Sequence, residues 1–130
     1  HLIDKYKVRI SILVPQNGEA GVKPEKGYRS MSTPHLVYPG QVDSFSYLNI
    51  GFFDNENEAE NFRKYMMCKL PRFMMRTTYS SAHISQSNFI FVPKMDYTRS
   101  WTDPELYEYF GLSDEEIQLV ESTMRPMSDC

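Results

Sequence analysis

The sequence has few of the residues that build disulfide frameworks and metal sites. It holds two cysteines and three histidines in 130 residues, and the histidines are scattered. Cys68 falls inside a predicted helix, Cys130 is the last residue of the sequence, and neither belongs to a Cys-x-x-Cys pair. This spacing argues against a disulfide framework and against a zinc site, and it predicts reduced thiols and a cytoplasmic setting.

Long hydrophobic runs and targeting signals are also lacking. No apolar stretch approaches the length of about 20 residues that a transmembrane helix needs. The sequence opens at His1 without a methionine and shows no signal-peptide pattern. We therefore expect no membrane partner, and we expect the chain to be the C-terminal fragment of a longer protein.

Signatures of catalysis are absent as well. The sequence has no glycine-rich turn for a cofactor, no P-loop, no Gly-x-Ser-x-Gly and no Asn-Pro-Pro-Tyr-like amine site. A metal-dependent nuclease needs two acidic groups and a lysine on neighbouring strands. The only local candidates are Glu25-Lys26 and Asp43, and these positions fall in predicted loops. His83 lies near several serines, but nothing in the spacing fixes a Ser/His pair. The sequence thus predicts no catalytic residue, no metal ligand and no cofactor in this chain.

Aromatic and hydrophobic residues, by contrast, are plentiful. They make up 14% and 41% of the chain, and 130 residues fit one folded domain, residues 1–130. Arg125 is the only Lys or Arg after position 99, so the net charge of −3 hides a basic body over 1–99 and an acidic helical cap over 100–130. A basic body with an acidic cap can bind phosphate on one face. The alternative is that the acidic residues simply form the solvated faces of the helices. The acids of the cap are Asp103, Glu105, Glu108, Asp114, Glu115, Glu116, Glu121 and Asp129.

Alternating residues predict several strands. The stretch YKVRISILV, residues 6–14, is a half-buried strand with Lys7 and Arg9 on its outer face. Further strands are predicted at 35–38, closed by a Pro-Gly turn, at 45–53, with a bulge at Gly51, and at 88–93.

Capping signals predict the helices. Asn55 with Glu58 opens a central amphipathic helix whose apolar stripe reaches residue 73, and Pro71 should stop or kink it near residues 69–70. Two short C-terminal helices each begin with a capping box and a hydrophobic staple. The boxes are Thr102 with Glu105 and Ser113 with Glu116, and the staples are Trp101 with Leu106 and Leu112 with Ile117. The fold class is therefore α+β: a small mixed or antiparallel sheet packed by one central amphipathic helix, with two short C-terminal helices.

Basic and hydroxyl side chains gather in three segments, and this mixture is typical of phosphate and base contacts. In the central segment, basic residues at spacings of three and four can share a helix face, and a polar run follows them. We expect His83 and Gln86 to read bases and the lysines of the loop at 16–32 to contact phosphates. A solvated basic helix followed by a polar loop is the plainer interpretation of the central segment. The candidate DNA contacts are Lys7, Arg9, Lys23, Lys26, Arg29, Lys69, Arg72, Arg76, Thr78, Tyr79, His83, Ser85 and Gln86.

Three stretches resemble the C-terminal region of bacterial restriction–modification adenine-N6 DNA methyltransferases, some of which are fused to a restriction endonuclease. They are KVRIS, SYLNIGFFDNENEAENFRKYMMCKLPRFMM and FVPKMDYTRSWTDPELYEYFGL, and the ending up to VES continues the likeness. His83 falls where that family commonly has a histidine. Pro71 departs from the family, which has an aromatic there, and the loop at 16–32 has no clear counterpart.

The resemblance implies a target-recognition domain that positions double-stranded DNA. The adenine would be methylated by a catalytic domain outside this chain, and S-adenosylmethionine would bind there. The other partners would be the methyltransferase or nuclease domains of the same polypeptide. Two alternatives stay open: a docking module of the same system that touches little DNA, and a fragment that holds part of a nuclease site.

Overall fold

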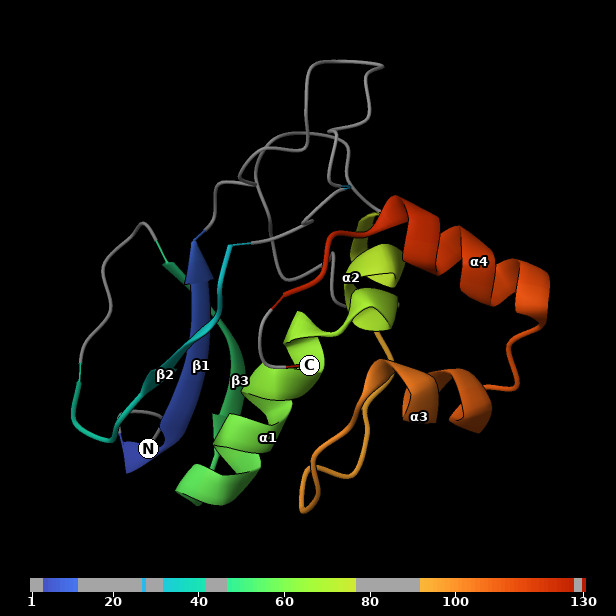
Figure 1. The fold of residues 1–130 in the computed structure, drawn as a ribbon. Coiled ribbons are helices and arrows are strands. Elements are labelled where there is room, and N and C mark those ends of the chain that lie inside the picture. The colour runs from blue at the N-terminus through green and yellow to red at the C-terminus, as the bar shows by residue number, and fades with distance from the viewer. Residues whose placement is uncertain (1–3, 12–26, 28–31, 42–46, 77–91, 128–129) are drawn as a thin grey trace.

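The computed structural model describes residues 4–11, 27, 32–41, 47–76, 92–127 and 130. These residues form a three-stranded sheet and four helices, which confirms the α+β class (Figure 1). The elements are β1 (Tyr6–Ser11), β2 (His35–Val37), β3 (Tyr47–Phe53), α1 (Glu56–Met67), α2 (Lys69–Arg76), α3 (Asp103–Tyr109) and α4 (Asp114–Thr123). The strand expected at 88–93 lies outside the described residues as far as position 91, and positions 92–93 are not in a strand.

The sheet is antiparallel, with β1 between β2 and β3. Val8 and Ile10 are fully buried and point toward α1, which packs against all three strands. Gly51 pairs with Val8, but the next pair joins Arg9 to Asn49, so Ile50 is an extra residue on β3. The bulge expected at Gly51 is thus present at the neighbouring residue, Ile50. A Cβ at Gly51 would lie 2.8 Å from the ring of Phe62, so α1 approaches the strand closely at that point.

Two consecutive helices replace the single helix that the sequence predicts after Asn55. Asn55 caps α1 as expected, since its side chain accepts a hydrogen bond from the backbone N–H of Glu58. The break falls at Cys68, one residue before the predicted stop, because Cys68 has an extended backbone. Pro71 is the third residue of α2, where its missing N–H is not needed by the helix. The proline therefore fits the start of a new helix instead of ending an old one.

The two C-terminal helices begin where the sequence predicts. Thr102 and Ser113 each form a complete capping box with the glutamate three residues later. Gly111 follows α3 with a φ of 63°, the left-handed conformation that glycine adopts without steric cost. Local side-chain chemistry therefore fixes both helix starts.

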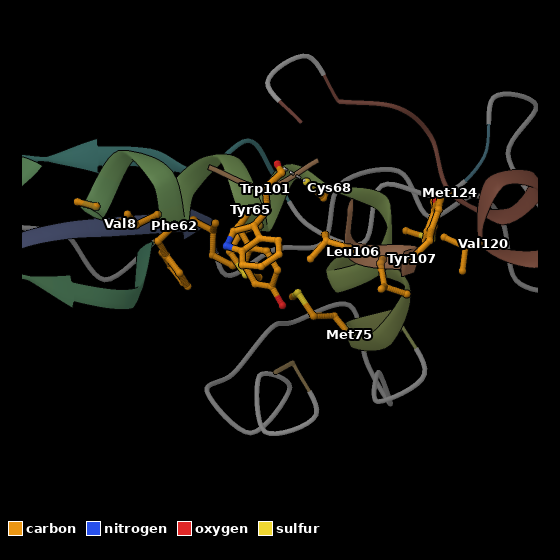
Figure 2. Close-up of a cluster of buried hydrophobic side chains, with 14 residues drawn as sticks. Val8, Phe62, Tyr65, Cys68, Met75, Trp101, Leu106, Tyr107, Val120 and Met124 are labelled. Atoms are coloured by element: carbon orange, nitrogen blue, oxygen red, sulfur yellow. Dashed lines mark hydrogen bonds between the residues drawn. The ribbon is translucent and has the colours of Figure 1, made fainter. Parts of the chain in front are cut away.

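The core runs from the sheet through α1 to the C-terminal helices (Figure 2). Trp101 is buried beside Cys68, and its indole N–H donates to the carbonyl of Asp96 at 2.8 Å. Asn61 of α1 donates to the carbonyl of Tyr97 at 2.9 Å, and Tyr65 donates to that of Pro93 at 2.8 Å. Segment 92–101 is thus tied to α1 by polar bonds as well as by packing.

Among the helices that the structure describes, none is long and apolar enough to cross a membrane.

Candidate nucleic-acid interface

A row of three polar side chains crosses the sheet on the face opposite α1. Arg9 of β1 pairs directly with His35 of β2 and with Asn49 of β3. Directly paired residues of antiparallel strands point to the same side of a sheet, and Val8 and Ile10 point to the other side. The row therefore joins a guanidinium, an imidazole and a carboxamide within two strand spacings, roughly 10 Å.

Aromatic rings flank this row. The guanidinium of Arg9 lies 4.3 Å from the ring centre of Tyr47, a cation–π contact that orients the arginine. Tyr47, the first residue of β3, and Phe52, the last residue but one, are both partly exposed. His35 is exposed, whereas Arg9 and Asn49 are half-buried. The face thus combines one exposed imidazole with rings that can stack on bases, whereas Nε of Arg9 and Oδ1 of Asn49 are buried.

Lys7 does not belong to this outer surface, contrary to the sequence prediction. Only 6% of Lys7 is exposed, and its Nζ donates to the carbonyl of Gln41 at 3.0 Å. Strand alternation predicted the direction of the side chain, but it could not show that residues 38–41 return beside β1.

Arg72 is not on the surface either, although the sequence predicted it as a DNA contact. It is fully buried, and its Nε donates to the carbonyls of Met67 and Cys68 at 3.0 and 3.2 Å. One of its terminal nitrogens donates to the carbonyl of Arg125 at 2.7 Å. Lys69, Arg72 and Arg76 therefore do not form one DNA-facing surface, because the middle residue fastens the α1–α2 break to the segment after α4.

Lys69 forms an ion pair within the domain. Its Nζ lies 2.9 Å from a carboxylate oxygen of Glu121 on α4. Burial raises the pKa of Tyr107, whose hydroxyl stays protonated and donates to the same carboxylate. That hydrogen bond, with a smaller contribution from Lys69, lowers the pKa of Glu121. Arg76 is half-buried at the end of α2.

The remaining predicted DNA contacts lie outside the described residues. They are Lys23, Lys26, Arg29, Thr78, Tyr79, His83, Ser85 and Gln86. His35, Tyr47 and Asn49, which lie beside Arg9, are not among the contacts that the sequence predicted. Alternation within β3 puts Tyr47 and Asn49 on one side, but only the register of the sheet brings them beside Arg9.

The two cysteines form a disulfide, which corrects the prediction of separate reduced thiols. Cys68, at the break between α1 and α2, is bonded to Cys130 across 62 residues of sequence. Figure 1 shows the C-terminal end returning to that break. Asp103 lies beside the pair, and its carboxylate oxygen and the two sulfur atoms all lie within 4.8 Å of one another. Sequence separation concealed this proximity, since neither cysteine has a nearby partner in the chain.

The disulfide borders a cavity of about 450 Å³ between α2, α3 and α4. Asp103, Cys130 and the Lys69–Glu121 pair line it. Burial raises the pKa of Asp103, although hydrogen bonds from the backbone N–H groups of Leu70 and Lys69 oppose this shift. A second cavity, of about 550 Å³, lies between β3, α1 and residues 92–97 and is lined largely by apolar side chains.

Comparison with protein-family models, with curated proteins and with solved structures finds no match to this chain.

Proposed function

We propose that this chain is a DNA target-recognition domain of a restriction–modification adenine methyltransferase, and that the sheet face around Arg9 contacts duplex DNA. The row of His35, Arg9 and Asn49 carries the proposal. The resemblance of three stretches of the sequence to the C-terminal region of that enzyme family supplies the class of protein.

The chemistry of the row fits the edges of bases in the major groove. Arginine can donate hydrogen bonds to guanine, and the amide nitrogen of an asparagine can donate to a base acceptor, but Oδ1 of Asn49 is buried and would not take part. The major groove is about 12 Å wide and admits a two-stranded ribbon, and β1 with either neighbour is such a ribbon. Phosphate contacts would then come from the basic segments outside the described residues, Lys23, Lys26 and Arg29 among them.

The charge distribution supports this orientation. The acidic helices α3 and α4 lie at the opposite end of the molecule from the sheet (Figure 1). DNA on the sheet face would therefore be kept away from the acidic cap. In this proposal the chain works in the cytoplasm beside a catalytic domain that binds S-adenosylmethionine, and it performs no chemistry itself.

The test is the salt dependence of DNA binding by the full chain, followed by the fluorescence anisotropy of a labelled mixed-sequence duplex. We expect a dissociation constant of roughly 10⁻⁴ to 10⁻⁶ M at physiological salt, and an affinity that falls steeply as the salt concentration rises. Arg9→Ala should weaken binding and reduce its dependence on salt, and His35→Ala, at an exposed position, should weaken binding without affecting the fold.

Lys69→Gln is the matched control. It removes one positive charge as Arg9→Ala does, but from the cavity between α2 and α4, where Glu121 already compensates it. It should change DNA affinity much less. Equal losses in the two variants, or no salt-dependent binding by the parent chain, would rule out the sheet face as the DNA contact.

A docking role has one observation in its favour. Tyr109 is 64% exposed and Leu119 is 54% exposed, and both lie among the acids of α3 and α4. This acidic surface suits a basic face of the catalytic domain of the same polypeptide. Calorimetry of the chain with that separately purified domain tests the role: Leu119→Ser should weaken association and leave DNA affinity unchanged.

A further inference from the structure

Three parts of the chain bring metal-binding atoms together at the α1–α2 break. Cys68 lies in the break, Asp103 is the first residue of α3, and Cys130 comes from the C-terminal segment. Their sulfur and carboxylate atoms lie within 4.8 Å of one another. Two thiolates and a carboxylate are a ligand set that Zn²⁺ accepts.

The carboxylate is already held in place. One oxygen of Asp103, Oδ1, accepts hydrogen bonds from the backbone N–H groups of Lys69 and Leu70 at 2.9 and 3.3 Å. A carboxylate has a second oxygen with lone pairs, and hydrogen bonds of this kind orient metal ligands in proteins. Asp103 thus caps α2 and can ligate with its other oxygen at the same time.

We propose that reduction of the Cys68–Cys130 disulfide creates a Zn²⁺ site from Cys68, Asp103 and Cys130. A dithiol supplies two electrons and two protons, the S–S bond breaks to give two thiols, and the dithiol becomes a cyclic disulfide. Zn²⁺ then displaces the two thiol protons and binds both sulfurs. The chain therefore exists in two exclusive forms, one with a disulfide and one that binds metal.

The geometry requires only a small movement. Two thiolates on one tetrahedral zinc lie roughly 3.8 Å apart and bonded sulfurs about 2 Å apart, so the sulfurs separate by under about 2 Å. Asp103 and Cys130 line the cavity of about 450 Å³, so water from this cavity can supply the fourth ligand. Lys69 lines the same cavity, where it is paired with Glu121.

The proposal is independent of DNA binding, apart from one point. A cytoplasmic location, which belongs to the proposed function, would keep both cysteines reduced and favour the metal-binding form. Metal binding by the purified chain is measured without DNA, so the two proposals can fail separately.

Titration of the reduced full chain with Co²⁺, in the absence of oxygen, tests the site. We expect one Co²⁺ per chain, a thiolate-to-cobalt absorption band in the near ultraviolet, the visible bands of tetrahedral cobalt, and displacement of Co²⁺ by Zn²⁺. The oxidised chain should show none of these bands. Circular dichroism of the reduced chain before and after titration reports whether the fold is retained.

Three variants identify the ligands. Cys68→Ser and Cys130→Ser should each abolish the intense thiolate band. Asp103→Asn keeps a side chain that can cap α2 and should weaken Zn²⁺ binding by at least about tenfold. Glu121 lines the same cavity but does not belong to the ligand set, so the Zn²⁺ affinity of Glu121→Gln should stay close to that of the parent. The proposal is overturned by a reduced, folded chain that gives no thiolate band, by a band that survives Cys68→Ser, or by an Asp103→Asn variant of unchanged affinity.

Discussion

Replacement of Arg72 by methionine tests whether this residue is a structural fastener or a DNA contact. Its guanidinium is fully buried and donates to three backbone carbonyls, those of Met67, Cys68 and Arg125. The first two carbonyls lie at the break between α1 and α2, and the third lies in the segment after α4. One side chain therefore connects the end of α1, the start of α2 and the C-terminal segment.

The expected loss of stability follows from the carbonyl groups that methionine would leave unpaired. Methionine fills a similar space but donates no hydrogen bond, so three carbonyls lose a donor. Each buried carbonyl left unpaired costs about 1–3 kcal/mol, and each hydrogen bond to a charged group contributes about 1.5–3 kcal/mol. Removing the buried charge recovers part of this, because the guanidinium no longer has to be desolvated. We expect a net loss of about 3–5 kcal/mol in the free energy of unfolding.

Urea denaturation followed by circular dichroism measures this loss. With a denaturant slope of about 1.5 kcal/mol per molar, the midpoint should fall by roughly 2–3 M, with the slope itself unchanged. Lys64→Met is the matched control, since Lys64 is a half-buried cation in the last turn of α1. Its loss should cost no more than about 1 kcal/mol, the size of a helix-dipole contribution.

Arg72→Lys adds a second check, because lysine keeps the charge but lacks the planar fork that spans three carbonyls. Its stability should lie between those of the parent and Arg72→Met. A midpoint of Arg72→Met equal to that of the control would refute the structural role. Unchanged stability together with lost DNA affinity would restore Arg72 as a DNA contact.

Three further predictions concern stability and ionisation. Trp101→Ala should cost roughly 3–5 kcal/mol in thermal unfolding, because only 7% of this residue is exposed; an unchanged melting temperature would contradict its place in the core. Gly27→Ala should cost about 2–4 kcal/mol, because Gly27 has a φ of 92° and its Cβ would lie 2.9–3.0 Å from backbone atoms of residues 123–125; a stability equal to that of the parent would show that this contact does not form. The backbone N–H and then the hydroxyl of Ser113 lower the pKa of Glu116 below its usual 4.5, so this group stabilises the fold above pH 4.5 and the contribution disappears as pH falls through the lowered pKa. Ser113→Ala should raise that pKa only in part, as an NMR titration can measure, since the backbone donor remains; a full return to 4.5 would disagree with the assignment.

The starts of α1, α3 and α4 were determined by the sequence itself. Asn55, Thr102 and Ser113 cap their helices as predicted, and Gly111 ends α3 in the left-handed conformation. These features depend on residues within one turn of each other, so local chemistry is enough to fix them. The α+β class followed from the same local patterns.

The break between α1 and α2 shows where local reasoning weakens. Pro71 signalled an interruption, but the interruption falls at Cys68, where a side chain from far along the sequence takes part. Asp103 accepts the N–H groups of Lys69 and Leu70 and so starts α2 from 34 and 33 residues away. A cap supplied by a distant segment leaves no signal near the helix that it starts.

Tertiary structure alone decided the roles of the charged and sulfur-bearing side chains. Lys7 and Arg72 were read as surface cations, yet each donates to carbonyls from segments that the sequence does not place nearby. Cys68 and Cys130 meet because the C-terminal segment returns to the α1–α2 break, and Arg9 meets His35 and Asn49 because of strand register. Local propensity depends on neighbours in sequence, whereas burial, ion pairing and ligand geometry depend on neighbours in space, and only the folded chain determines those.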